Sequence, residues 1–285
     1  MQMDNVTRYQ NAALQYYRDL TGSSHLHYGY WQPVPETEAD LTMAQLRQAQ
    51  EQYTQHLLSF LPQGISTVLD VGCGNGDNAS QLIDKGLEVE GLAPDPIQES
   101  NFLQKTRGKA RFNSNTFQGF IENFQQIKST KNYDLLLFSE STQYMSSETI
   151  ANGAKLLVKP EGYVLLADML RKNSDYQEGM FSNCLIKNEL QGAMEKAGFV
   201  LLTSDDISQQ IVPTLDLCVQ NFQTFGVSTL TYLANLVRIA VPPLYKIFDY
   251  FLGKQAKALV KEGLQAGNIF RDHLCYEIQL WQRLA

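Results

Sequence analysis

Short apolar runs alternate with segments of helical periodicity through most of this chain of 285 residues. Runs rich in valine, leucine and aromatic residues predict strands, whereas apolar residues spaced three and four apart predict helices. The predicted strands cover residues 68–71, 87–93, 110–117, 133–140, 163–169, 200–208 and 272–283. The predicted helices cover residues 38–61, 96–106, 147–162 and 188–199, with one more that ends near Gly86.

This alternation predicts an α/β fold, with a doubly wound, mostly parallel sheet of seven strands and helices on both faces. Unbroken apolar runs, such as residues 135–138, support strands that are buried on both sides. The order of the elements predicts an N-terminal helical cap and lid (1–62), a Rossmann-like core (63–209), a helical insertion over the substrate site (210–265) and a closing strand of the core (266–285).

Composition narrows the class of protein. Lysine and arginine number 23 against 30 aspartates and glutamates, a net charge of −7 with no basic run, so no nucleic-acid partner is expected. The polar N-terminus, and the charged and proline residues within the apolar segment 227–253, predict a soluble cytoplasmic protein without a membrane span. The four cysteines are far apart in the sequence, so we expect neither a disulfide framework nor a metal site.

The stretch "VLDVGCGNGD" places a glycine turn between the first strand and a helix. Gly72, Gly74 and Gly76 let the backbone pass close beneath a ligand, at the edge where α/β sheets bind nucleotides. A dinucleotide fingerprint of the form G-x-G-x-x-G would need a third glycine where this chain has Asp77. The spacing therefore disfavours a nicotinamide cofactor.

With the acid Asp70 before it, the turn resembles motif I of the class I S-adenosylmethionine-dependent methyltransferases. Over residues 9–208 the chain is similar to the small-molecule subgroup that includes tocopherol, glycine-betaine-forming and natural-product sugar O-methyltransferases. The resemblance implies S-adenosylmethionine as cofactor, S-adenosylhomocysteine as product and a small acceptor methylated at O, N or C. It also implies that the turn residues contact the methionine part of the cofactor: Asp70, Gly72, Cys73 and Gly74.

Other segments of the resemblance imply further cofactor contacts. Most class I enzymes place an acid for the ribose where this chain has Ala93, so Gln98 is the expected ribose ligand. Asp95 is the alternative ligand, although it also suits a turn between two prolines. From "GFIENF" we expect Ile121 and Glu122 beside the adenine, the glutamate being at a helix start. From "FSESTQYM" we expect Phe138, Ser139 and Gln143 along the methionine part.

The general base that the resemblance implies is missing, because sugar O-methyltransferases of this group have histidine at one or both of the positions held here by Gln143 and Tyr144. Asp168, Glu140 or His27 would then replace it, and Tyr144 would orient the acceptor. His27 belongs to "HLHYGYW", a segment that the resemblance places across the cofactor as a lid with Tyr17, Tyr28 and Trp31. His27 is thus either a base with a pKa near the working pH or a residue that holds the lid by a backbone hydrogen bond.

The insertion bears on the acceptor. Residues 222–260 are aromatic and apolar, which predicts a roof over a bulky, partly apolar acceptor of the secondary-metabolite kind. The same residues would equally serve as core or as the surface of a homodimer. Two further classes remain: a non-catalytic S-adenosylmethionine-binding protein, suggested by the missing base, and a macromolecule methyltransferase, disfavoured because "FSES" replaces an "NPPY"-type motif.

Overall fold

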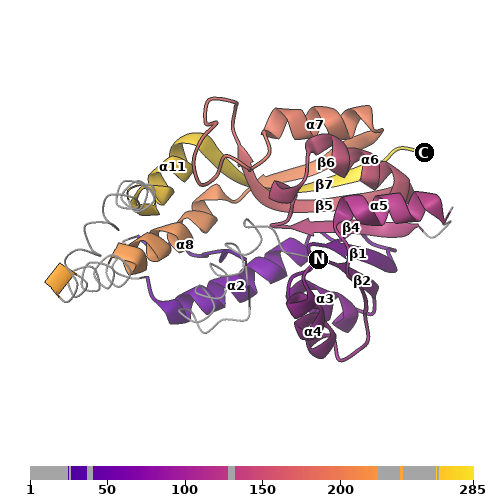
Figure 1. The fold of residues 1–285 in the computed structure, drawn as a ribbon, viewed down its shortest axis with the longest axis horizontal. Coiled ribbons are helices and arrows are strands. Elements are labelled where there is room, and N and C mark those ends of the chain that lie inside the picture. The colour runs from indigo at the N-terminus through magenta and orange to yellow at the C-terminus, as the bar shows by residue number, and fades with distance from the viewer. Residues whose placement is uncertain are drawn as a thin grey trace.

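The computed structural model describes residues 25, 27–36, 41–127, 132–223, 238–239, 261 and 263–285. Its strands form one seven-stranded sheet in the order β3-β2-β1-β4-β5-β7-β6 (Figure 1). Strands β1 to β5 pair in parallel, whereas β7 runs antiparallel to β5 and β6. The strands are β1 (Thr67–Val71), β2 (Glu88–Leu92), β3 (Arg111–Asn113), β4 (Tyr133–Ser139), β5 (Val158–Arg171), β6 (Phe199–Asp206) and β7 (Leu274–Arg283). The predicted α/β class and mostly parallel sheet are confirmed.

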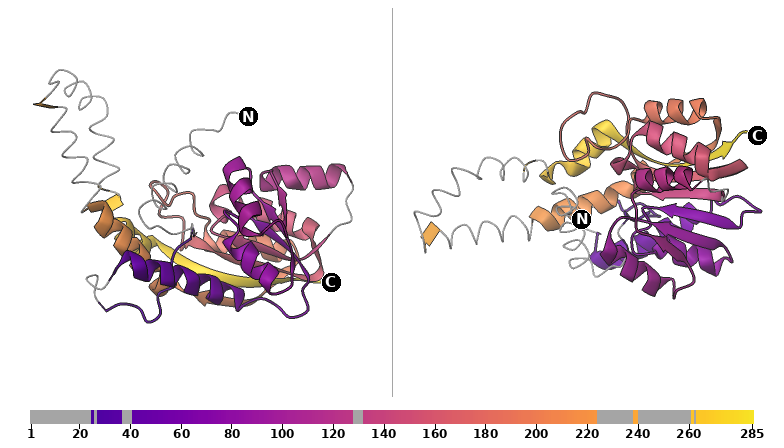
Figure 2. Two further views of the ribbon diagram at one scale, coloured as in Figure 1. Left: turned by 90° about the horizontal axis from the view of Figure 1, so that it is seen from below. Right: turned by 45° about the vertical axis from the view of Figure 1, so that its right-hand side comes forward.

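Helices cover both faces of the sheet (Figures 1 and 2). One buried cluster joins Val68, Leu137 and Tyr276 of the sheet to helices α2, α3, α4, α8 and α11, and the other joins Leu69 and Leu136 to α5, α6 and α7. No described helix is long and apolar enough to cross a bilayer. The helices are α2 (Met43–Leu58), α3 (Asp77–Asp84), α4 (Pro96–Lys105), α5 (Phe117–Gln126), α6 (Ser147–Leu157), α7 (Lys187–Lys196), α8 (Ser208–Asn221) and α11 (Ala266–His273), with a 3₁₀ turn η2 (Thr142–Tyr144).

Side-chain caps decide where several helices begin. The Thr116 hydroxyl accepts a hydrogen bond from the backbone N–H of Gly119 at 3.1 Å, so α5 begins at Phe117. The predicted strand over 110–117 is therefore shortened to β3, because its last residue belongs to the helix. Glu122 consequently lies in the middle of α5 and not at a helix start, which corrects the expectation from the sequence.

The boundary between α6 and β5 also differs from the prediction. The helix ends at Leu157, and Val158 already pairs with Tyr133 of β4, so residues 158–162 are not helical. A register shift follows, because Leu135 pairs next with Tyr163 and Glu161 takes a φ of +61° in between. The helix ends because Val158 already takes an extended conformation and joins the sheet, a change that periodicity alone does not mark.

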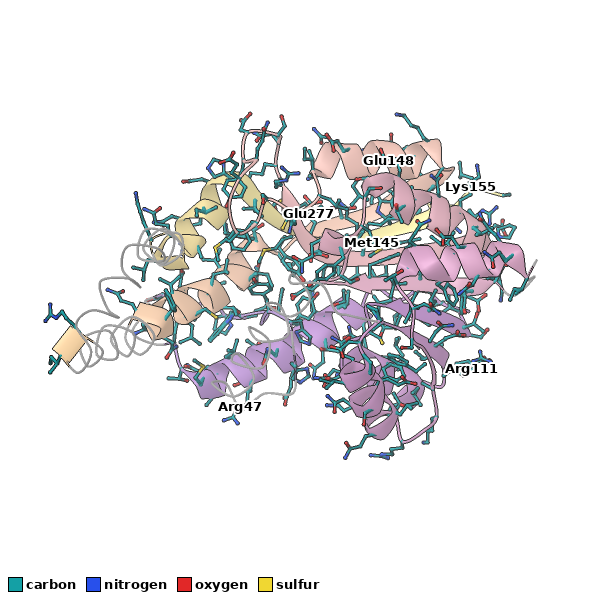
Figure 3. All side chains as sticks on the ribbon, in the orientation of Figure 1. Arg47, Arg111, Met145, Glu148, Lys155 and Glu277 are labelled. Atoms are coloured by element: carbon teal, nitrogen blue, oxygen red, sulfur yellow. The ribbon has the colours of Figure 1, made fainter. Side chains whose placement is uncertain are left out.

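The predicted boundaries after residues 62, 209 and 265 stay predictions. Most of the insertion and nearly half of the cap lie outside the described residues, as does Tyr17. Exposed cations of the described part lie at its periphery, where Figure 3 labels Arg47 on α2, Arg111 on β3 and Lys155 on α6.

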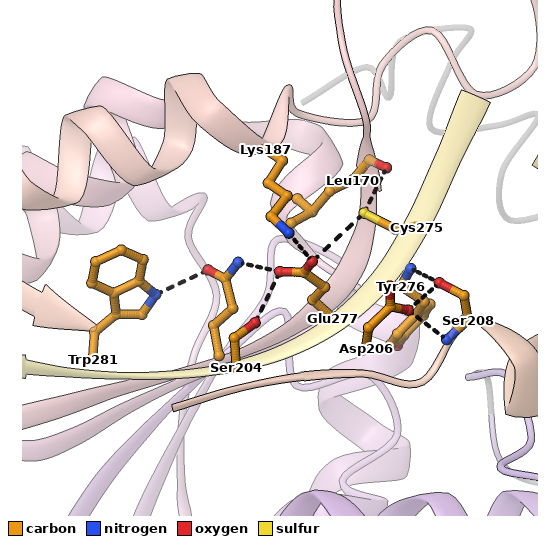
Figure 4. Close-up of polar contacts among 10 residues, drawn as sticks. Leu170, Lys187, Ser204, Asp206, Ser208, Cys275, Tyr276, Glu277 and Trp281 are labelled. Atoms are coloured by element: carbon orange, nitrogen blue, oxygen red, sulfur yellow. Dashed lines mark hydrogen bonds and ion pairs between the residues drawn. The ribbon is translucent and has the colours of Figure 1, made fainter. Parts of the chain in front are cut away.

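The closing strand β7 presents different chemistry to its two faces. Tyr276, Ile278 and Leu280 point toward the cluster that contains α2. On the α7 side, the buried Glu277 carboxylate accepts hydrogen bonds from Lys187, from Ser204 at 3.0 Å and from Gln279 at 2.8 Å (Figure 4). This polar ladder ties β7 to β6 and α7.

Candidate functional site

The glycine turn follows β1 at the carboxyl edge of the sheet, the edge where β1, β2, β4 and β5 end. Gly72, Gly74 and Gly76 have φ angles of +75°, +53° and +88°, which L-residues rarely adopt. A Cβ on Gly72 would lie 2.3 Å from the Cβ of Ser141, so no larger residue fits there. The turn thus keeps bare backbone at the point where the sequence predicts the cofactor.

Beneath this turn, Asp70 is 1% exposed, and burial raises its pKa to about 7. Its Oδ2 atom has no hydrogen-bond partner among the described residues. A buried acceptor atom without a donor is unfavourable, so this position suits a ligand that brings an N–H group or a positive charge. The ammonium group of S-adenosylmethionine has that chemistry.

Residues 27–31, here called the strap, lie between α2 and α8. The backbone N–H of Tyr30 donates to the Ala49 carbonyl at 2.8 Å, and that of Trp31 donates to the Gln210 carbonyl at 3.0 Å. The strap packs so closely that a Cβ on Gly29 would lie 2.7 Å from the Ala49 Cβ. Strap and helices therefore form one packed unit beside the glycine turn.

His27 is buried within this unit. Its ring stacks on Tyr53, with centroids 4.5 Å apart. Nδ1 lies 2.9 Å from the Tyr28 carbonyl oxygen, which requires the proton on Nδ1, and Nε2 lies 3.2 Å from the Thr54 hydroxyl. Burial, and secondarily His25, lowers the pKa of His27 to about 4. This geometry favours the lid-holding role, and the role of general base stays a prediction.

Glu140 connects the strap to the sheet. It follows β4 with a φ of +52°, and its backbone N–H donates to the Ala167 carbonyl at 2.9 Å. Its Oε1 atom accepts hydrogen bonds from the Tyr28 backbone N–H and from the Tyr276 hydroxyl, both at 2.9 Å. Burial is the main cause that raises the pKa of Glu140 to about 8, and Asp168 adds to it. The carboxyl group is therefore held in place by the backbone of Glu140 and by the two donors to its Oε1 atom.

Two tyrosines extend this network, and the sequence did not single out either as a site residue. The Tyr53 hydroxyl lies 2.7 Å from the Tyr276 hydroxyl and 3.2 Å from Ser139 Oγ. Both tyrosines are fully buried, on α2 and on β7 respectively. In the sequence they read only as apolar positions of a helix and of a closing strand, so periodicity offered no signal for them.

Asp168 holds the turn η2. Its side chain lies on the face of β5 opposite to that of Ala167 and Met169. Its Oδ2 atom accepts hydrogen bonds from the Thr142 N–H and hydroxyl, both at 2.8 Å, and Oδ1 accepts one from Met169 N–H at 2.8 Å. Burial raises its pKa to about 6 despite these bonds. Asp168 thereby positions the turn that carries Gln143 and Tyr144, and its two oxygens are already occupied.

Gln143 donates to the Tyr144 hydroxyl at 3.3 Å, and Tyr144 is 57% exposed. Although more than half of the residue is exposed, partial desolvation of its hydroxyl group, followed by Asp168 and Glu140, raises the pKa of Tyr144. An exposed phenol beside two carboxyl groups suits contact with an acceptor, the role that the sequence predicted for it.

The predicted ribose and adenine residues are arranged differently. Asp95 accepts a hydrogen bond from the Ile97 N–H at 2.8 Å and so caps α4, while Gln98 is partly accessible in the first turn. Ala93 is buried after β2 and Cys73 is buried within the turn. This arrangement favours Gln98 over Asp95 as the ribose ligand, and that role stays a prediction.

On the other face of the sheet, Phe138 is fully buried edge-on against Phe117, with ring centroids 5.4 Å apart. Ile121 packs against the same cluster, and Glu122 is exposed and accepts a hydrogen bond from Gln118 at 2.8 Å. The structure therefore gathers Tyr28, Asp70, Ser139 and Glu140 on one side, and Phe138 and Ile121 on the other. Within the described residues no group of three or more metal-ligating side chains occurs.

The chain is similar in sequence to known proteins. A family model described as a methyltransferase domain matches residues 45–204. A protein of Geobacillus sp. (strain WCH70), named as a methyltransferase, is 31% identical over 88 residues. That match spans 30% of this chain and 34% of the relative, so it covers about a third of the curated protein.

Solved structures share the fold over nearly the whole chain. A Galdieria sulphuraria protein, assigned as a sarcosine dimethylglycine methyltransferase, superposes with a TM-score of 0.68 at 15% identity, covering 95% of this chain and 97% of that one. Geranyl diphosphate C-methyltransferase from Streptomyces coelicolor A3(2), solved with Mg²⁺, geranyl diphosphate and S-adenosyl-L-homocysteine, gives 0.64 at 15% identity over 91% of each chain. At such identities the likeness concerns the fold.

Proposed function

We propose, from the premise that this chain belongs to the family of methyltransferase domains, that it transfers a methyl group from S-adenosylmethionine to a small acceptor. The observation that carries the proposal is the glycine turn at the carboxyl edge, with the unpartnered Asp70 oxygen beneath it. Together they provide space for a nucleoside and an acceptor atom for its ammonium group.

Bound S-adenosylmethionine supplies a methyl group on a positively charged sulfur. Asp70 would face the ammonium group, and Gln98 would bind the ribose by a hydrogen bond. The strap would exclude water from the reacting atoms, which also strengthens electrostatic interactions between them. Asp168 would hold η2 so that Tyr144 meets the acceptor.

Glu140 is the strongest candidate for a group that acts directly on the acceptor. Its Oε1 atom is taken by two donors, whereas Oε2 has no hydrogen-bond partner among the described residues, and the residue is partly accessible. A carboxylate that is fixed on one oxygen and open on the other can orient an acceptor or take its proton. His27 is the second candidate, with both ring nitrogens engaged.

The nature of the acceptor is part of this proposal. The aromatic, apolar residues 222–260 support a bulky, partly apolar molecule of natural-product biosynthesis, methylated at O, N or C. All four cysteines are free thiols, in keeping with a cytoplasmic location. A homodimer stays an expectation from the sequence.

Binding measurements test the proposal. We expect the full chain to bind S-adenosylmethionine and S-adenosylhomocysteine in calorimetric titrations, and to bind NAD⁺ far more weakly. Gly74→Asp should abolish both interactions, because a charged side chain would fill the space above the turn, while Gly64→Asp, in an open turn before β1, should not.

Tighter binding of NAD⁺, or unchanged affinity in Gly74→Asp, would contradict the proposal. If the cofactor binds but labelled methyl groups never reach any molecule of a metabolite extract, the chain is a binding protein without this catalysis.

A further inference from the structure

Three acidic side chains lie at the carboxyl edge of the sheet without ion-pair partners among the described residues. Asp70, Glu140 and Asp168 lie near the ends of β1, β4 and β5, and within the described residues none of them forms an ion pair. Several buried or partly buried acids elsewhere in the described part do have cationic partners. These pairs are Asp77 with Lys105, Asp134 with Lys159, Asp216 with Arg271, and Glu277 with Lys187.

Among the described residues, the groups that surround Glu140 carry no positive charge. The Tyr28 amide and the Tyr276 hydroxyl bind its Oε1, the Tyr53 hydroxyl stands behind Tyr276, and Asp168 is the other charged neighbour that raises its pKa. The exposed cations that Figure 3 labels, Arg47, Arg111 and Lys155, lie at the periphery. A carboxylate in this setting favours a cation and opposes a second anion.

A second acid, which the proposed function assigns to the ammonium group of the cofactor, lies on the same face. Asp70 follows Val68 by two positions in β1, so both side chains point to the face where Tyr276 and Leu137 pack. Its Oδ2 atom is buried and unpartnered among the described residues. One face of the carboxyl edge therefore holds two acids whose free oxygens meet no cation among the described residues. With the cofactor bound, Asp70 would face its ammonium group, and Glu140 would remain for the acceptor.

From this arrangement we infer that the acceptor is an amine, and that Glu140 recognises the positive charge that its nitrogen carries after methylation. The inference rests on the proposed function and makes it more specific. An acceptor that bears a phosphate or carboxylate at the reacting end would meet like charge and is disfavoured.

Methylation of an amine requires no reactant besides the acceptor and the methyl donor. The lone pair of the amine nitrogen forms the new N–C bond, the pair of the broken C–S bond returns to sulfur, and the positive charge passes to nitrogen. Glu140 is held in position beforehand by its backbone and by two donors to Oε1, so it need not reorganise as that charge appears.

Three probes of similar shape isolate the effect of charge: choline, its uncharged analogue 3,3-dimethylbutan-1-ol, and the anion 3,3-dimethylbutanoate. We would first measure S-adenosylhomocysteine binding to the full chain, and then titrate each probe into the saturated protein by calorimetry. Choline should bind at least about tenfold more tightly than the alcohol, and the anion should bind more weakly than both.

Glu140→Gln should remove the preference for choline, because the amide still accepts the bonds of Tyr28 and Tyr276 but carries no charge. Glu148→Gln, at an exposed position on α6, is the matched control and should retain the preference. Circular dichroism melting verifies that each variant is folded.

A parallel incubation with labelled cofactor should methylate members of an amine library in preference to matched alcohols and phenols. Equal binding of choline and the alcohol, or a preference that survives Glu140→Gln, would overturn the inference and leave the proposed function intact. Failure of S-adenosylhomocysteine to bind at all would instead overturn the proposed function.

Discussion

Two glutamates on opposite sides of β7 show how differently one fold treats a buried acid. Glu277 faces α7, where Lys187, Ser204 and Gln279 occupy both of its oxygens (Figure 4). Glu140 meets the other face through Tyr276 and receives only uncharged donors, all on one oxygen. A charge that serves the fold is compensated within the chain, whereas a charge left uncompensated is available to a ligand.

Removing the cation at Glu277 should give the largest effect on stability. Lys187→Met leaves a glutamate that is 2% exposed without its counter-charge, and we expect the free energy of unfolding to fall by about 3 kcal/mol. Urea denaturation measures this loss. Choline and S-adenosylhomocysteine should bind as before, since Lys187 lies on the far side of the strand.

Two controls sharpen that experiment. Adding Glu277→Gln to Lys187→Met should restore most of the stability, because no unpaired charge then remains. Lys155→Met, at an exposed position of α6, should change the free energy of unfolding by less than about 0.5 kcal/mol. A destabilisation of that small size in Lys187→Met would show that the two glutamates do not differ as described.

The next largest effect should be a pH dependence of the free energy of unfolding that comes from Glu140. Its pKa is raised in the folded protein, from 4.5 to about 8, so between these values the folded state keeps a proton that the unfolded state releases. Stability therefore falls as pH rises through this window, by at most about 1.4 kcal/mol per pH unit. Denaturation curves at several pH values should show a shallower slope for Glu140→Gln, with Asp70 and Asp168 retaining a residual slope of the same sign.

Choline does not titrate, so its affinity reports the charge state of the site. It should rise with pH as Glu140 ionises, with Asp168 and Asp70 contributing earlier, and it should be much less dependent on pH in Glu140→Gln. A steeper pH dependence of choline binding in the variant than in the natural protein would contradict the role given to Glu140.

The smallest effects should come from deleting one hydroxyl donor at each glutamate. Tyr276→Phe and Ser204→Ala should each lower the free energy of unfolding by about 1 kcal/mol. Only Tyr276→Phe should move the pH midpoint of choline binding upward, because its hydroxyl stabilises the ionised form of Glu140. A shift of that midpoint in Ser204→Ala would break the distinction between the two sides.

The fold was largely predictable because its signals are local. Alternating strands and helices predicted the sheet class, and three glycines after Asp70 predicted the turn, whose φ angles are all positive. The start of α5 and the end of α6 were missed because the Thr116 cap and the pairing of Val158 with Tyr133 of β4 leave no mark in the periodicity.

The network around Glu140 was not predictable in the same way. Tyr276 is 136 residues distant in the sequence and meets Glu140 only because antiparallel β7 places it beside Met169. Tyr53 reaches Ser139 from a helix whose sequence shows only an amphipathic pattern. Contacts of this kind depend on strand order and register, which no local pattern specifies.

The Thr214 hydroxyl accepts hydrogen bonds from both the Gly29 N–H, at 3.0 Å, and the Trp31 indole, at 2.9 Å. One oxygen atom of α8 thus holds two points of the strap, and the N–H of Tyr28, the residue immediately before Gly29, donates to Glu140. Together with the Gln210 carbonyl, which accepts from the Trp31 N–H, this oxygen ties α8 to the strap, so a shift of the helix that leads toward residues 222–260 would be expected to move the donor of Glu140 at the end of β4.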